Sequence, residues 1–188
     1  METKRTFLAI NVEPQADIIN LMEYMKRFHR MDNIKWVNPK QMHLTIFFLG
    51  DTSTTQIPAI VDRLMVCIKA FSPFKIGLKG LGVFGRPSPR VIWVGVEFPE
   101  SLVRLKLAID DILDGFGYSN DNKEFNPHLT IGRVKFLHNI DRLNAEIQQY
   151  KSKQFQEQVV KGIVLYESIL RPQGSEYRVI QMFDLLGG

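Results

Sequence analysis

The tetrapeptide His-Leu-Thr-Ile occurs twice in this sequence, and the two copies contain two of its four histidines. The copies are residues 43–46 and 128–131, nearly half of the chain apart. Each lies in an apolar stretch that predicts a β-strand, and an Asn-Pro pair precedes each of them. A single histidine in a strand is usually structural. The same histidine repeated in matched surroundings predicts a functional pair on two similar lobes.

The alternation of side chains along a strand divides each copy between two faces. His43 and Thr45 point to one side, and His128 and Thr130 repeat the arrangement. The leucine and isoleucine of each copy point to the opposite side, where we expect them to pack against helices. The sequence therefore predicts a cleft between the lobes, lined by two imidazoles and two hydroxyl groups.

Two facing histidines suit phosphoryl chemistry. The ordinary histidine pKa is about 6.5, so near neutral pH one imidazole can accept a proton while the other donates one. The hydroxyl groups and a nearby cation would stabilise charge on the phosphorus centre. The alternative is a metal site, but no third ligand is apparent, because His29 and His138 are expected at the surface. We therefore expect no metal.

The elements around the repeat alternate between strand and helix patterns. Apolar runs and alternation predict strands at 6–12, 42–49, 74–84, 90–98, 125–134, 158–166 and 176–185, with a short extended piece at 35–39. Helical periodicity predicts helices at 14–28, 57–71, 101–113 and 141–150. Because no linker-like segment interrupts the pattern, we expect residues 1–188 to form one α+β domain with two pseudo-symmetric lobes.

Charge and composition narrow the class of partner. The 24 basic residues outnumber the 20 acidic ones and the pI is about 9.2, which favours anionic partners such as phosphates or RNA. The single cysteine, Cys67, excludes a disulfide within the chain and a cysteine-rich zinc module. No apolar run is long enough for a membrane span or a signal peptide. We expect a cytoplasmic protein with no membrane partner.

Several segments together resemble the two-histidine (2H) phosphoesterase superfamily. The closer match is the RNA 2′,3′-cyclic phosphodiesterase family, historically called 2′–5′ RNA ligase. The segments that carry the resemblance are Arg5-x-Phe7-Leu8-Ala9-Ile10, Trp36, His43 to Gly50, Gly82-x-Phe84, Arg90-Val91-x-Trp93-x-Gly95, Pro127 to Arg133, and Leu165 to Tyr177.

The resemblance implies a fold and an activity. The fold would be bilobal α+β, with two antiparallel sheets around a central groove and helices outside. The activity would be hydrolysis of an RNA terminal 2′,3′-cyclic phosphate to a 2′-phosphate, without cofactor, by a monomer. It implies His128 as the base and His43 as the acid, although the repeat makes them locally equivalent. A weak 2′–5′ ligation of RNA ends, such as tRNA halves, is also implied. The alternative is a non-catalytic RNA- or nucleotide-binding module that uses the same groove.

The fifth position after each histidine differs between the copies. It is Phe48 after His43 and Arg133 after His128. The resemblance implies that Phe48 stacks on the terminal base and that Arg133 binds the phosphate. The alternative for Phe48 is a core aromatic residue, and the alternative for Arg133 is a solvated surface charge. An odd offset falls on the wrong face of a regular strand, so a functional role requires a bulge, for which Gly132 is a plausible place.

Overall fold

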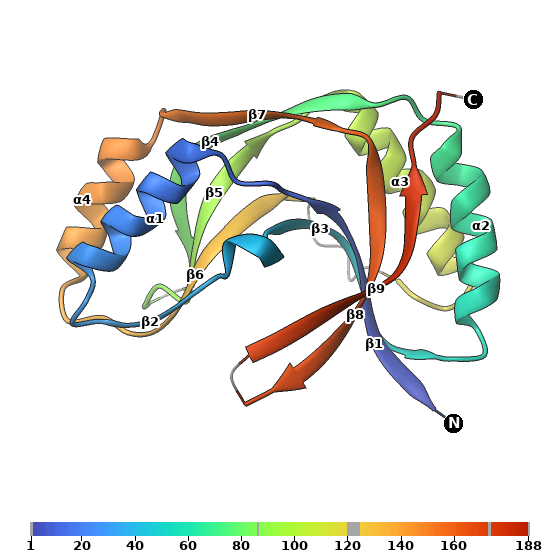
Figure 1. Ribbon diagram of the computed structural model, residues 1–188, viewed down its shortest axis with the longest axis horizontal. Helices are drawn as coiled ribbons and strands as arrows, with labels where there is room; N and C mark the ends of the chain where they lie inside the picture. Colours follow the sequence, from blue (N-terminus) through green and yellow to red (C-terminus); the bar gives the residue numbers. More distant parts are fainter. Residues whose placement is uncertain (1, 86, 120–124, 173, 188) are drawn as a thin grey trace.

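The computed structural model describes residues 2–85, 87–119, 125–172 and 174–187. Within these residues the chain forms two antiparallel sheets and four α-helices (Figure 1). The expected α+β class with two antiparallel sheets is therefore confirmed. No helix in the described part of the chain is long and apolar enough to span a membrane.

The four-stranded sheet contains the first copy of the repeat. Its strand order is β3 (His43–Ser53), β1 (Thr3–Asn11), β8 (Gly162–Arg171) and β9 (Gly174–Asp184). Helices α2 (Ile57–Lys69) and α3 (Glu100–Asp114) pack against each other beside this sheet, and α2 contacts β9 (Figure 1). Ile60, Leu64 and Ile68 recur at helical spacing and are buried, which explains why α2 forms and which face it turns inward.

The five-stranded sheet contains the second copy. Its order is β2 (Asn33–Trp36), β6 (His128–Phe136), β5 (Val91–Glu97), β4 (Phe74–Phe84) and β7 (Gln154–Val160). Helix α1 (Ala16–Phe28) contacts β7 and α4 (Ile140–Tyr150) contacts β4. The Asn139 side chain caps α4 by accepting a hydrogen bond from the Arg142 backbone N–H at 3.0 Å. A 3₁₀ turn at Pro39–Gln41 then leads into β3.

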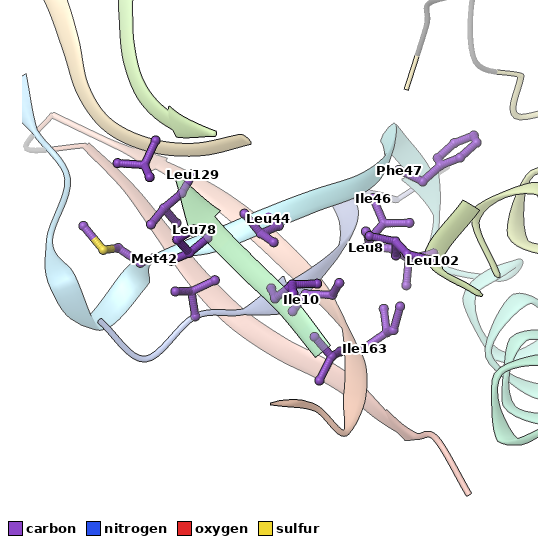
Figure 2. Packing of buried hydrophobic residues seen from close by; sticks show 14 of the residues in the cluster. Leu8, Ile10, Met42, Leu44, Ile46, Phe47, Leu78, Leu102, Leu129 and Ile163 are labelled. Carbon is purple, nitrogen blue, oxygen red and sulfur yellow. The ribbon is translucent and has the colours of Figure 1, made fainter. Parts of the chain in front are cut away.

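One continuous apolar core joins the two sheets. Leu44 and Leu129, from the two copies of the repeat, are both fully buried, and they belong to the same cluster as Ile10 and Leu78. Figure 2 shows these residues packed together, with Met42 just before β3 and Ile46 on β3. The leucine of each copy therefore holds its strand against the common core, which leaves the opposite face of each strand for other contacts.

The expected single strand at 158–166 is wrong. β7 ends at Val160 and β8 begins at Gly162, and these two strands belong to different sheets. Apolar residues flank the junction on both sides because both strands are partly buried, so the hydrophobic pattern alone does not show that two strands meet here. Gly162 lies directly after this change of sheet. A side chain does not fit there, because a Cβ would lie 2.7 Å from the Phe183 carbonyl oxygen.

The expectation that His29 lies at the surface is also wrong. His29 follows α1 and is 2 % exposed. Its Nδ1 lies 2.6 Å from Asp32 Oδ2 and its Nε2 lies 2.6 Å from Glu146 Oε2 on α4. His138 is at the surface as expected, with a side chain 57 % exposed. The buried histidine joins two helices that are distant in the sequence.

The hairpin of β8 and β9 extends past the sheet that carries it. β8 pairs with β1 only over Val164–Glu167, whereas its ladder with β9 continues to Arg171 and Gly174. Residues 168–171 and 174–177 are therefore a two-stranded projection, which we call the hairpin tip (Figure 1).

Candidate active site

The two copies of the repeat meet at a cavity of about 610 Å³. β3 and β6 belong to different sheets but contact each other, so their polar faces lie on either side of one space. His43 and Thr45 line it from β3, and His128 and Thr130 line it from β6. Arg133 lines it as well. Five of the six residues predicted from the sequence therefore gather in one place.

A bulge in each strand brings the fifth position onto the same face as the histidine. In β3, Thr45 pairs with Ala9 and Phe47 pairs with Leu8, so Ile46 is the extra residue. In β6, Thr130 pairs with Trp93 and Gly132 with Ile92, so Ile131 is the extra residue. Each bulge falls three positions after the histidine, and each reverses the alternation. The bulge expected at Gly132 is thus present one residue earlier, and β3 has its counterpart.

The two histidine rings are anchored in the same way. His43 Nδ1 donates to the carbonyl oxygen of Gln41 at 2.8 Å, and His128 Nδ1 donates to that of Asn126 at 2.9 Å. In both cases the acceptor is the backbone two residues upstream. Because a carbonyl oxygen only accepts, Nδ1 carries the hydrogen in each neutral ring and Nε2 is left with a lone pair. Nε2 of each ring can then act as a base when neutral and as an acid when protonated.

Aromatic rings hold both imidazoles in place. The Tyr177 ring lies edge-on to His43, with centroids 5.1 Å apart, and Phe7 lies 5.0 Å from the same ring. Phe84 lies edge-on to His128 at 4.7 Å. Tyr177 also lines the cavity. Its ring contact with His43 depends on pairing between distant strands, which no local pattern reveals.

The environment of His43 disfavours its charged form. Burial is the largest cause, and the charges of Arg133 and His128 act in the same direction, so the pKa of His43 falls below its ordinary value of 6.5. The hydrogen bond to the Gln41 carbonyl opposes this shift without cancelling it. His43 is therefore neutral in the free protein near pH 7.

Phe48 lies apart from the other predicted residues. It is 47 % exposed and is not among the residues that line the cavity. The Arg5 guanidinium lies over its ring, 4.9 Å from the centroid, and the Phe7 ring is stacked 6.5 Å away. Phe48 is thus an exposed aromatic residue on the histidine face of β3 and not a core residue, and base stacking on it stays a prediction.

Elements that flank the repeat complete the cavity. Trp36, Val37 and Gln41 line it between β2 and β3, and the hairpin tip closes another side. Lys35 and Arg171 add positive charge to this lining. Within the described ranges, no group of three or more His, Cys, Asp or Glu side chains is placed to hold a metal ion. The arrangement suits an anion that accepts hydrogen bonds while protons move to and from two imidazoles.

The fold and the paired histidines define a two-histidine phosphoesterase. This chain belongs to the 2′-5′ RNA ligase superfamily, which its sequence matches over residues 14–167. The family resemblance drawn from the motifs is thereby confirmed.

Named relatives match over nearly their whole length. The RNA 2′,3′-cyclic phosphodiesterase of Archaeoglobus fulgidus is 35 % identical over 185 residues, which cover 96 % of this chain and 99 % of that protein. The protein of the same name from Methanocaldococcus jannaschii is 36 % identical, over 94 % of this chain and 98 % of its own. The crystal structure of TT0787 from Thermus thermophilus superimposes with a TM-score of 0.79 at 26 % identity, covering 97 % of this chain and 98 % of that one.

Proposed function

We propose that this chain is an enzyme that hydrolyses the 2′,3′-cyclic phosphate at RNA ends to a 2′-phosphate. The observation that carries the proposal is the pair of histidines with Nδ1 bound to a backbone carbonyl, both lining one cavity with Arg133. Membership of the superfamily and the names of the full-length relatives support it.

The proposed reaction moves two protons through the pair. One histidine takes a proton from water at Nε2 as the water oxygen bonds to phosphorus. The other gives a proton from Nε2 to the 3′ oxygen as the bond between phosphorus and that oxygen breaks, which leaves a 2′-phosphate and a 3′-hydroxyl. Arg133 binds the phosphate oxygens, and Thr45 and Thr130 donate hydrogen bonds to them. No step requires a metal or a cofactor.

The family resemblance assigns the base to His128 and the acid to His43. The lowered pKa of His43 sets a condition on that assignment, because a neutral imidazole cannot donate the proton. The phosphodiester is an anion, and its charge beside the ring raises the pKa of the imidazole. We therefore propose that His43 gains its proton when the substrate binds.

The finer features follow from the same site. As a minor activity, the site would join RNA ends, such as tRNA halves, through a 2′–5′ bond. A 5′-hydroxyl takes the place of water, gives its proton to the base histidine and bonds to phosphorus, while the 3′ oxygen leaves with a proton from the acid histidine. All of the proposed residues come from one chain, so we propose that it acts as a monomer. The matched bulges and matched Nδ1 anchors support one domain, residues 1–188, with two pseudo-symmetric lobes.

The test is incubation with adenosine 2′,3′-cyclic phosphate in excess chelator, with the products followed by phosphorus NMR. We expect adenosine 2′-phosphate alone, at an unchanged rate when the chelator is varied. A mixture of 2′- and 3′-phosphates would contradict the fixed orientation, and a strict need for added divalent metal would contradict the mechanism. Binding of the nucleotide without turnover would indicate the alternative, a binding module.

A further inference from the structure

Two cations from opposite sheets gather at the hairpin tip. Lys35 is on β2 and Arg171 ends β8, and both line the cavity. Arg171 pairs with Gly174 in the hairpin ladder, and a Cβ added at Gly174 would lie 2.5 Å from Lys35 Nζ. The Lys35 ammonium group of the five-stranded sheet therefore reaches the hairpin of the four-stranded sheet. It lies beside Gly174, whose lack of a side chain leaves room for it.

The cavity lining at the hairpin tip carries more basic than acidic side chains. Arg171 Nε contacts Glu176 Oε2 at 3.0 Å, and Arg178 Nε contacts Glu176 Oε1 at 2.7 Å, so two guanidinium groups share one carboxylate. Glu176 is the one acidic residue among the described residues that line the cavity. Lys35 and Arg171 outnumber Glu176 in the lining at the tip, which favours an anion there.

The tip lies along the cavity from the histidines. Tyr177 contacts the His43 ring, and Gly174 lies three residues before Tyr177 on β9, toward the turn of the hairpin. At about 3.3 Å per residue, the strand covers about 10 Å between them. A nucleic acid strand whose terminal phosphate lies at the histidines can therefore place an earlier phosphate at the tip.

We propose that Lys35 and Arg171 bind the phosphodiester that precedes the terminal nucleotide, so that the chain prefers oligoribonucleotide ends to single nucleotides. The inference rests on the proposed function and names its substrate class. A guanidinium fork and an ammonium group both suit phosphate oxygens, and contacts to the backbone carry no base preference. The selectivity is therefore for chain length and not for sequence.

The test compares two substrates that share one scissile ring. These are adenosine 2′,3′-cyclic phosphate and the dinucleotide ApA with a terminal 2′,3′-cyclic phosphate. We expect the ratio of kcat/KM for the dinucleotide to that for the mononucleotide to fall at least about fivefold in Lys35→Met and in Arg171→Met. The slope of log kcat/KM against log salt should also become shallower for the dinucleotide, because the variant neutralises one phosphate charge fewer.

Arg178→Met is the matched control. Arg178 binds the same carboxylate from the same hairpin, but it is not among the residues that line the cavity. We expect it to keep the wild-type ratio, and Lys35→Arg, which retains the charge, to keep most of it. An unchanged ratio in both methionine variants, or an equal fall in Arg178→Met, would overturn the inference. Failure of the proposed function looks different, because the wild-type protein would then hydrolyse neither substrate.

Discussion

His43 and His128 hold matched positions, so their removal should have matched effects. Acid and base act in one displacement, and each alanine variant should lose about a hundredfold or more in kcat. Thr45→Ala and Thr130→Ala should cost less, since each removes one hydrogen bond to a charged group, about 1–3 kcal/mol. Steady-state assays with circular dichroism as a check on folding measure both. Near-normal activity in either histidine variant would refute the paired mechanism.

The protonation of His43 is a second expectation at the scale of single residues. Its pKa lies below 6.5 in the free protein, because of burial and the nearby charges of Arg133 and His128. Binding of the product adenosine 2′-phosphate should raise that pKa, since the ligand is an anion. Nitrogen NMR of the labelled imidazole at pH 7 should show Nε2 unprotonated before the ligand is added and protonated afterwards. A His43 ring that stays neutral with the product bound would instead assign the acid role to His128.

The bulge in β6 is the feature that matters most at the scale of elements. Gly132 follows the extra residue, and a Cβ there would lie 3.1 Å from both Ile34 and the Trp36 ring on β2. Gly132→Val should push β2 outward, move Arg133 and reduce kcat/KM, with a loss of about 1–3 kcal/mol in unfolding free energy from overpacking.

Gly77→Val is the control for that variant. Gly77 lies on β4 of the same sheet, where a Cβ would meet the end of the flexible Gln154 side chain at 2.9 Å. We expect activity to be retained there. If both valine variants keep full activity, Gly132 does not position Arg133. Urea unfolding and steady-state kinetics on the two proteins decide the comparison.

The sequence was sufficient for the parts of the site that depend on local periodicity. Alternation placed His43 and Thr45 on one face, and the odd offset of Arg133 required a bulge that the structure contains. The features it missed all depend on distant pairing. Tyr177 reaches His43 only through the hairpin, and the change of sheet at Lys161 falls between two apolar stretches that read as one strand. Phe48, like Arg133, stands five positions after a histidine and follows a bulge, but it is not among the residues that line the cavity.

The buried cluster around His29 bears on the stability of the whole molecule, because it joins α1 to α4. The hydrogen bond to Glu146 is the largest cause that raises the pKa of His29; burial opposes it, and Asp32 supports it. His138 also faces Asp32, through its backbone N–H at 2.7 Å and its ring at 3.2 Å. Those contacts and the one from His29 outweigh burial and lower the pKa of Asp32.

A pH dependence of stability follows from the raised pKa of His29. The charged His29 contributes its full stabilisation of the folded state below the pKa of the unfolded state, which is about 6.5. That stabilisation is lost as pH rises through the higher pKa of the folded state. The difference in unfolding free energy between wild type and His29→Gln should therefore shrink as pH rises through that window. Urea titrations across the window measure it. His138→Gln, at an exposed ring, is the control and should show a smaller change; an equal change would contradict the role of the buried histidine.

The position of β1 between β3 and β8 sets an order of events during synthesis on the ribosome. β1 can pair with β3 once the first third of the chain has emerged, but its other edge waits for β8, which is made near the end. Tyr177, which packs against His43, emerges later still. Because folding proceeds from the N-terminus as the chain is made, the first histidine exists long before its surroundings do. A nascent chain that stops before the hairpin would carry both histidines and still lack a finished site.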